Sequence, residues 1–242
     1  MRISKDEDKE WLNYLSRFSD EYDERVYSGN TTGYVMRAGH VACEKPFGES
    51  EHFSRVLEVG SGTGEHLLHV NHTFDEYIVS DGDAAALELA QKQLNHINSY
   101  DKLTFDVTNA RQLNFENNSF DRVIATHILE HLYEPHLVIK EWLRVLKPGG
   151  TLSILIPTDP GIAWKIGRYC TTRKQGLAKG WNYDYIMARE HVNPCNNLIA
   201  FLRYYLPEHQ KSFWPMSFVP LIDCNLFFNF HGIKPDSSSE KK

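Results

Sequence analysis

The sequence GSGTG at residues 60–64 directly follows the short apolar segment VLEV at 56–59, and residues compatible with a helix resume at Glu65. Glycines at such a turn reach positive φ without steric cost and let a ligand approach the main chain, and a helix start offers unpaired N–H groups. A strand, a glycine-rich turn and a helix start in this order predict an α/β fold with a nucleotide-like cofactor at the turn.

The spacing of the glycines argues against a dinucleotide. The Gly-x-Gly-x-x-Gly fingerprint would place its third glycine at position 65, where Glu65 stands, and the glycine is Gly64. A carboxylate at Glu58, beside the turn, would repel a phosphate and suit an ammonium or sulfonium group. The second predicted strand, 77–81, ends at Asp81, where doubly wound folds use an acid to bind a ribose diol. The pattern favours a cationic cofactor with a ribose, with a nicotinamide-nucleotide binder as the alternative.

Several motifs together resemble one family, the class I S-adenosylmethionine (SAM)-dependent methyltransferases. Residues 58–64 match its Glu/Asp-x-Gly-x-Gly-x-Gly signature, and Phe120-Asp121, Glu130-His131 and RVLKPGG at 144–150 match its small-molecule branch, which includes the type 11 domains. The resemblance covers roughly residues 52–157. It implies SAM as the cofactor and a Rossmann-like, seven-stranded, mostly parallel sheet with helices on both faces and an antiparallel last strand.

The resemblance also implies which residues contact the cofactor. Asn109 stands where the family usually has an acid that contacts the adenine amino group; its side-chain oxygen can accept the same hydrogen bond, although Asn109 could also simply stabilise a turn. The predicted cofactor-binding residues are Glu58, Gly60, Ser61, Gly62, Gly64, Asp81, Asn109, Ala110 and Thr126.

The length of 242 residues predicts one domain, and the resemblance implies its division into five parts. These are an N-terminal helical cap (1–51), a SAM-binding core (52–157), a helical lid (158–212), closing strands (213–234) and a disordered tail (235–242). Helices are predicted at 6–25, 31–44, 84–95, 135–146 and 189–205 and after the glycine turn, and further strands at 103–106, 120–126, 151–156, 213–219 and 226–233.

A possible catalytic group follows the predicted strand 120–126, because ligands bind beyond the carboxyl ends of parallel strands. His127, Glu130 and His131 share one face of a helical turn there. Some metal-dependent relatives carry Glu-x-x-Glu-His at this position, but this chain has His-x-x-Glu-His, so we predict no metal. His127 is the predicted base for a hydroxyl acceptor, since an unperturbed histidine titrates near neutral pH; for a carbon or nitrogen acceptor it would only orient the substrate.

The acceptor pocket is predicted from the cap and the lid. From Pro160 to Tyr183 there is no acid, while lysines, arginines and aromatic residues are frequent. Such a lid favours an acceptor with phosphate or carboxylate, although basic residues on a solvated helix are the simpler explanation. The predicted acceptor residues are Tyr34, Arg37, His131, Lys165 and His191, with Tyr27 as a further candidate.

Composition limits the remaining possibilities. The net charge of −6 argues against nonspecific nucleic-acid binding, so the expected partner is a small molecule. Four cysteines without a C-x-x-C pair predict reduced thiols in a cytoplasmic protein, and no apolar run resembles a signal peptide or a membrane span. The sequence does not predict an oligomeric state. It leaves open a SAM-binding protein that has lost catalysis and acts through partners.

Overall fold

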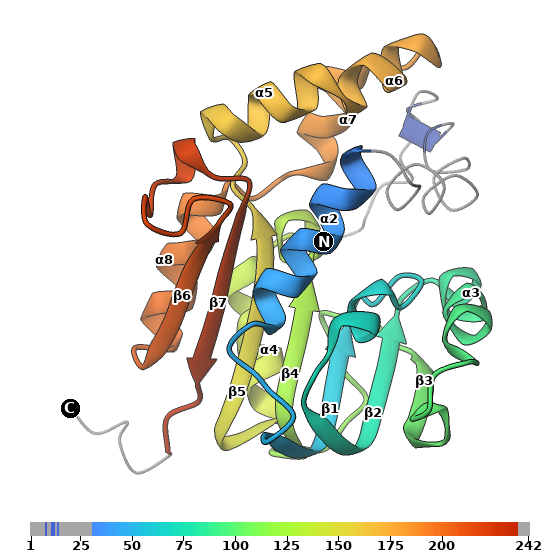
Figure 1. Cartoon of the computed structure of the whole chain (residues 1–242), viewed down its shortest axis with the longest axis vertical. Coiled ribbons are helices and arrows are strands. Elements are labelled where there is room, and N and C mark those ends of the chain that lie inside the picture. The colour runs from blue at the N-terminus through green and yellow to red at the C-terminus, as the bar shows by residue number, and fades with distance from the viewer. Residues whose placement is uncertain (1–7, 9–10, 13, 15–30, 237–242) are drawn as a thin grey trace.

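The structure, a computed structural model, describes Asp8, Trp11, Leu12, Tyr14 and residues 31–236 (Figure 1). Seven strands of this part form one sheet in the order β3-β2-β1-β4-β5-β7-β6. The first five are mutually parallel, and β7 is antiparallel to both of its neighbours, β5 and β6. This arrangement confirms the predicted fold class. The strands are β1 (His52–Val59), β2 (Thr73–Asp81), β3 (Leu103–Val107), β4 (Phe120–Thr126), β5 (Leu146–Pro157), β6 (His209–Trp214) and β7 (Phe227–Ile233).

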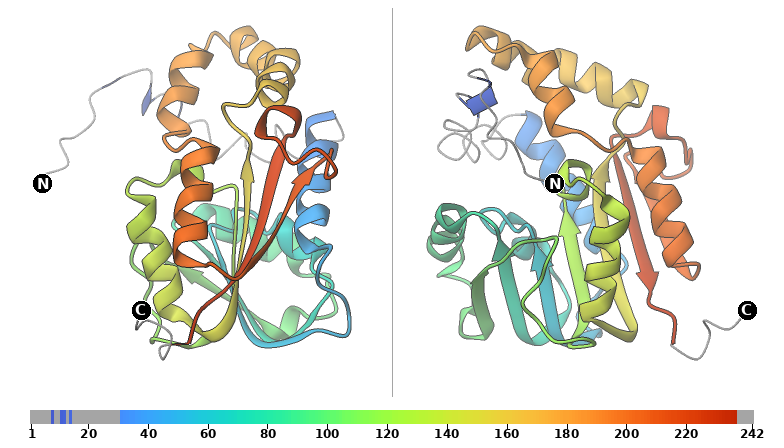
Figure 2. Two further views of the ribbon diagram at one scale, coloured as in Figure 1. Left: turned by 90° about the vertical axis from the view of Figure 1, so that its left-hand side faces the viewer. Right: turned by 180° about the vertical axis from the view of Figure 1, so that it is seen from behind.

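Helices cover both faces of the sheet (Figures 1 and 2). Alternate strand residues point to opposite faces, so one apolar cluster joins the sheet to α4 and α8 and another joins it to α3. Three further helices, α5, α6 and α7, lie beyond the carboxyl ends of the parallel strands. Among the described residues, no helix is long and apolar enough to cross a membrane. The helices are α2 (Thr31–Glu44), α3 (Ala84–Leu94), α4 (Pro135–Val145), α5 (Ile162–Cys170), α6 (Thr172–Ala178), α7 (Tyr183–Glu190) and α8 (Cys195–Tyr205).

Three predicted elements were wrong in extent. The helix expected after the glycine turn is only a 3₁₀ turn, η1 (Glu65–His69), because the chain enters β2 at Thr73. The strand expected at 213–219 ends at Trp214, since Pro215 has no N–H for the ladder. The helix expected at 189–205 is two helices, with Pro194 as the N-cap of the second. The predicted helix 6–25, Tyr27 and the tail beyond residue 236 lie wholly or largely outside the described residues.

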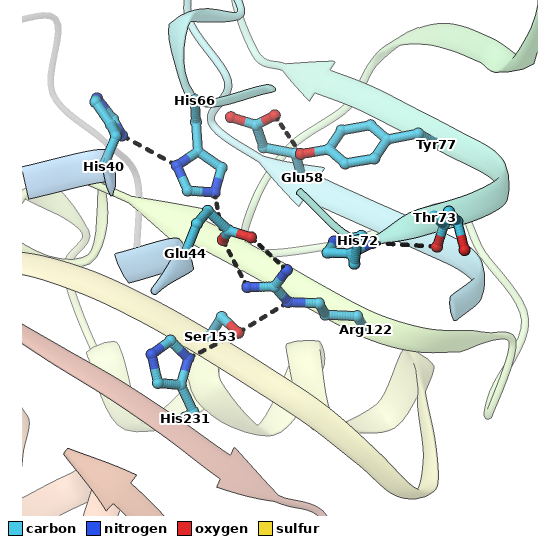
Figure 3. A network of polar contacts seen from close by, with 10 residues as sticks. All are labelled: His40, Glu44, Glu58, His66, His72, Thr73, Tyr77, Arg122, Ser153 and His231. Carbon is cyan, nitrogen blue, oxygen red and sulfur yellow. Dashed lines mark hydrogen bonds and ion pairs between the residues drawn. The ribbon is translucent and has the colours of Figure 1, made fainter. Parts of the chain in front are cut away.

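A buried ion pair fastens α2 to the sheet (Figure 3). Arg122 of β4 donates from Nη1 and Nη2 to both carboxylate oxygens of Glu44, at 2.9 and 2.7 Å, and neither side chain is exposed. Arg122 Nε donates to Ser153 Oγ at 3.0 Å, and the guanidinium lies 3.8 Å from the Phe47 ring centre. Burial alone would raise the pKa of Glu44, but Arg122 and a hydrogen bond from His66 hold that pKa well below its usual range. A matched pair of buried charges therefore joins α2 to β4.

Two buried histidines beside this pair predict acid sensitivity of the fold. Burial and the positive charge of Arg122 together lower the pKa of His72 to about 4 and that of His231 to about 3. In the unfolded chain each takes up a proton near pH 6.5, so the unfolded state binds more protons than the folded state below that pH. The stability that the two neutral histidines contribute is therefore fully present above pH 6.5 and is lost as the pH falls towards 4.

We expect the free energy of unfolding to fall between pH 7.5 and pH 5.0 by up to about 2 kcal/mol for each such histidine. Urea unfolding at the two pH values measures this loss. His231→Gln is expected to reduce the pH dependence, whereas His96→Gln, at an exposed position, is expected to leave it unchanged. An unfolding midpoint that is the same at both pH values would contradict this explanation.

Candidate active site

The glycine turn after β1 favours glycine at all three of its glycine positions, and at two of them a Cβ would also collide with a neighbouring side chain. All three have positive φ: +70° at Gly60, +54° at Gly62 and +83° at Gly64. A Cβ at Gly60 would lie 2.1 Å from Ile128 Cδ1, and one at Gly64 would lie 2.7 Å from Leu94 Cδ1. A Cβ at Gly62 would meet nothing within 4 Å. Gly60 and Gly64 thus allow close packing, while Gly62 leaves open space above the main chain for a ligand.

Gly60→Ala is expected to disturb this turn. The methyl group would collide with Ile128, and alanine at φ +70° is strained by about 1 kcal/mol or more. We expect the affinity for the cofactor to fall by at least about tenfold. Gly180→Ala is the control, because Gly180 also has positive φ but its Cβ would be in open space. Equal cofactor affinities of the two variants, measured by calorimetry, would contradict the steric argument.

Asp81 ends β2 beside this turn. Its Oδ2 accepts a hydrogen bond from Gly62 N at 2.8 Å, and its Oδ1 accepts from Asp83 N at 2.9 Å. Asp83 in turn caps α3, its carboxylate accepting from Ala85 N at 2.9 Å. The half-exposed Asp81 carboxylate is therefore oriented by two main-chain donors next to the open space over Gly62.

One large cavity, of about 1170 Å³, begins at this turn. Its walls come from the glycine turn, α2, the start of α3, the segment after β4, the helices α5 to α7, and the N-terminal residues Trp11 and Tyr14. Aromatic residues are frequent in the wall far from the turn: Trp164, Trp181 and Tyr183. Residues of the predicted cofactor site, such as Gly60 and Asp81, and of the predicted acceptor region, such as His191, line this same cavity.

Only some of the predicted cofactor residues line a cavity. Gly60, Gly62 and Asp81 line the large cavity. Ser61 and Thr126 line a smaller cavity of about 40 Å³ that also reaches Gly60 and Gly62. The remaining predicted cofactor residues line neither cavity: Glu58, Gly64, Asn109 and Ala110.

Glu58 lies behind the turn. Its side chain is 1% exposed, and Oε2 accepts from the Tyr77 hydroxyl at 2.8 Å (Figure 3). Burial raises the pKa of Glu58 above its ordinary value. The Glu58 side chain therefore packs inside the fold behind the turn, and its contact with a bound cofactor stays a prediction.

Asn109 forms a turn of its own. Its Oδ1 accepts from Arg111 N at 2.9 Å, and the carbonyl of Ala110 accepts from Trp142 Nε1 at 2.8 Å. These contacts fix the loop after β3 against α4. Contacts of Asn109 and Ala110 with an adenine ring stay predictions.

His127 lines both cavities, directly after β4, with φ +55°. Its main-chain N–H donates to Leu155 O at 2.8 Å, which fixes the turn. Burial, with the nearby His131 and His191, lowers the pKa of the His127 ring to about 3. The ring is thus neutral at neutral pH and is a weaker base than the near-neutral pKa assumed from the sequence.

Glu130 and His131 continue the wall from the short 3₁₀ turn η3 (Leu129–His131). Glu130 is 3% exposed, and burial raises its pKa to about 7. Its Oε1 lies 3.9 Å from His127 Nδ1 and 3.8 Å from His131 Nε2, distances too long for hydrogen bonds. In the part of the chain that the structure describes, no three His, Cys, Asp or Glu side chains are placed to hold a metal ion.

The predicted acceptor residues are only partly in the cavity. His131 and His191 line it, whereas Tyr34, Arg37 and Lys165 do not. Tyr34 is 68% exposed, while its neighbours on α2, Val35 and Met36, line the cavity.

The sequence analysis missed Asp159. It lies two residues beyond the end of β5, and its Oδ2 accepts from His191 Nδ1 at 2.8 Å and from Arg168 Nη1 at 3.1 Å. An acid just beyond a parallel strand is itself a signal of a site residue, because such positions lie at the ligand-binding edge of the sheet. His191 and Arg168 line the cavity, so Asp159 positions two of its wall residues.

Comparisons with known proteins place this geometry in a family. Residues 57–154, from β1 to β5, match a family model described as a methyltransferase domain. This segment is a class I methyltransferase domain. The match confirms the resemblance seen in the sequence, and it includes the glycine turn, Asp81 and His127.

Relatives of the methyltransferase domain are distant. The ubiquinone/menaquinone biosynthesis C-methyltransferase UbiE of Haemophilus ducreyi is 28% identical over 109 residues, 44% of this chain and 42% of that protein. The 27-O-demethylrifamycin SV methyltransferase of Amycolatopsis mediterranei is 28% identical over 119 residues, 45% of this chain and 42% of that protein. The chain thus matches less than half of the length of these relatives.

Among solved structures, the N-methyltransferase NodS from Bradyrhizobium japonicum WM9, in complex with S-adenosyl-L-homocysteine (SAH), resembles the chain with a TM-score of 0.63. The alignment covers 94% of this chain and 100% of NodS at 16% identity. At this identity the likeness shows the fold alone. The likeness in fold therefore extends beyond residues 57–154, the segment that matches the methyltransferase domain.

Proposed function

We propose that the protein transfers a methyl group from SAM to a small-molecule acceptor. The observation that carries the proposal is the single cavity that reaches from the glycine turn and Asp81 to the histidines and aromatic residues below α5 to α7. A donor and an acceptor held in one cavity can reach a near-attack geometry, which supplies most of the acceleration that such a displacement needs.

The residues at the turn fit the cofactor. The open space over Gly62 admits a ligand to the main chain, and the oriented Asp81 carboxylate can accept hydrogen bonds from a ribose diol. Ser61 Oγ is buried without a partner among the described residues, so it is available to a polar ligand atom. Bound SAM would supply a methyl group on a sulfonium. The chain's own task is then to hold the acceptor in line and to exclude water.

The cavity wall favours a largely apolar acceptor with rings over the anionic one considered from the sequence. Arg168 is paired with Asp159, Arg173 pairs with Asp184 at 3.0 Å, and Lys165 does not line the cavity. Apolar and aromatic side chains make up much of the wall beyond His127, and aromatic rings stack well on planar ligands. The names of the UbiE and rifamycin relatives also denote methyl transfer to small molecules.

We propose that His127 orients the acceptor, because its neutral ring lies in the cavity wall between the turn and the lid. His127→Ala is expected to lower kcat by about tenfold or more while the Kd for SAM stays the same. Steady-state rates and calorimetry measure the two quantities. An unchanged kcat would remove His127 from the mechanism.

Two other functions are tested directly. A nicotinamide-nucleotide binder would bind NADH in a fluorescence titration, whereas a methyltransferase is expected not to. A SAM-binding protein without catalysis would bind SAM but release no SAH with any acceptor. Release of SAH that depends on an added ring-bearing acceptor supports the proposal, and its absence across a broad panel would favour the inactive protein.

The remaining proposals concern organisation and location. We propose one catalytic unit in which the cap (1–51) and the lid (158–212) enclose the acceptor against the core (52–157). We also propose a cytoplasmic protein, since the described cysteines are all free thiols: Cys43, Cys170, Cys195 and Cys224. The acidic net charge supports a small molecule over nucleic acid as the partner.

A further inference from the structure

The cavity wall contains a histidine and carboxylate pair that the proposed function does not yet use. We propose that His191, oriented by Asp159, is the base that takes the proton from a hydroxyl group of a ring-bearing, largely apolar acceptor. This inference rests on the proposed methyl transfer and adds the acceptor's functional group and the base.

The geometry of the pair is that of an oriented base. His191 Nδ1 donates to Asp159 Oδ2 at 2.8 Å, which leaves the lone pair of the neutral ring on Nε2. Nε2 has no hydrogen-bond partner in the described part of the chain, and the ring lines the cavity. The His191 and Asp159 side chains are 13% and 15% exposed, so the pair is sheltered while still open to the cavity. The pair thus presents a single unoccupied proton acceptor to a ligand.

Asp159 is itself held in place. Arg168 Nη1 of α5 donates to the same Oδ2 at 3.1 Å. Burial alone would raise the pKa of Asp159, but the hydrogen bond from His191 and the charge of Arg168 lower it, so the carboxylate stays ionised. An ionised carboxylate favours the imidazolium that forms when Nε2 takes up a proton. Asp159 is therefore a positioning residue for His191.

The other titratable groups in this wall are less suited to the task. Burial lowers the pKa values of His127 and His131 to about 3, which makes both weak bases, and His131 Nδ1 is already bonded to Glu190 O at 2.9 Å. The Glu130 side chain is 4% exposed, compared with 13% for that of His191. The His131 and His191 rings are 5.0 Å apart edge to face, and Trp164 stacks 6.3 Å from His191. A planar ring can therefore lie against aromatic surface next to Nε2.

A hydroxyl is the acceptor group that makes use of such a base. A neutral hydroxyl is a poor nucleophile, so its proton must leave as its oxygen bonds to the methyl carbon. The carbon–sulfur bond of SAM breaks, its electron pair stays on the sulfur of SAH, and the proton moves to His191 Nε2 and later to water. An ionised thiol needs no such base, and an amine reacts through its own lone pair.

The test compares two acceptors of the same shape, 2-naphthol and 2-naphthalenethiol, at pH 7.5. The naphthol is largely un-ionised at this pH, whereas the thiol is largely ionised. With the wild type we expect both to be methylated, the naphthol on oxygen. His191→Gln is expected to lower kcat for the naphthol by about 100-fold or more and to change kcat for the thiol by less than about threefold. Asp159→Asn is expected to lower the ratio of kcat for the naphthol to kcat for the thiol by about tenfold or more.

Controls separate the outcomes. His136→Gln removes a histidine of α4 that does not line the cavity, and it is expected to alter neither rate. Equal losses for both acceptors in His191→Gln, or no loss, would overturn the base assignment. A wild type that binds SAM but methylates only the thiol, or neither compound, would overturn the hydroxyl acceptor. Absence of SAM binding to the folded wild type would instead overturn the proposed function itself.

Discussion

Arg122→Met is expected to lower the free energy of unfolding by about 3–5 kcal/mol, because it leaves the Glu44 carboxylate buried without its partner. The variant keeps much of the apolar stem of the side chain and loses the two hydrogen bonds to Glu44 and the one to Ser153. Urea unfolding at pH 7.5 measures the loss. Since a domain is typically stable by only about 5–15 kcal/mol, this change is among the largest that one substitution can cause.

Arg55→Met is the matched control for this effect. Arg55 also lies on a strand of the sheet and pairs with Glu76 at 2.6 Å, but both side chains are 38% exposed. An exposed pair is expected to contribute less than about 1 kcal/mol. The double variant Glu44→Met, Arg122→Met is expected to recover much of the lost stability, since no unpaired charge remains. A loss in Arg122→Met no larger than in Arg55→Met would show that the buried pair does not hold α2 to the sheet.

Asp81→Ala is expected to weaken SAM binding by at least about 100-fold, because hydrogen bonds to a charged acceptor are worth about 1.5–3 kcal/mol each. The substitution removes the carboxylate that we assign to the ribose and also the contacts that orient it, from Gly62 N and Asp83 N. Isothermal titration with SAM measures the affinity. A Kd within about threefold of the wild-type value would remove Asp81 from the cofactor site.

The control for this prediction is Asp106→Ala. Asp106 is the neighbour of Ser80 on β3, is half-buried and does not line the cavity. It is expected to leave the affinity for SAM unchanged. A similar loss in both variants, with circular dichroism and urea midpoints unchanged, would point to an effect of net charge on binding and not to a contact of Asp81.

The alternation of strands and helices and the glycine turn were predictable because their signals are local. Positive φ at Gly60, Gly62 and Gly64 and an acid at the end of β2 are encoded by residue types within about twenty positions of one another. The apolar runs of the parallel strands are buried on both faces, so they stand out in the sequence as well. These features also carried the family resemblance.

The wall of the cavity was less predictable, because it depends on which face of a helix meets the sheet. Tyr34 and Val35 are adjacent on α2, but one helical step turns the side chain by about 100°, so one is exposed and the other lines the cavity. Asp159 and His191 are 32 residues apart in the sequence, and the packing of α5 and α7 brings them together. The periodicity of apolar residues does not indicate such a pair. The low pKa of His127 likewise follows from burial and from neighbours that come together only in the fold.

The measurement that tests the central claim most directly is an isothermal titration of the wild-type protein with SAM, followed by one with SAH. The account predicts saturable binding of both with one site per chain and a Kd of roughly micromolar order. Absence of binding heat over a range of temperatures, in protein that circular dichroism shows to be folded, would contradict it. The glycine turn would then serve another ligand, and the cavity would lose its assignment as a methyl-transfer site.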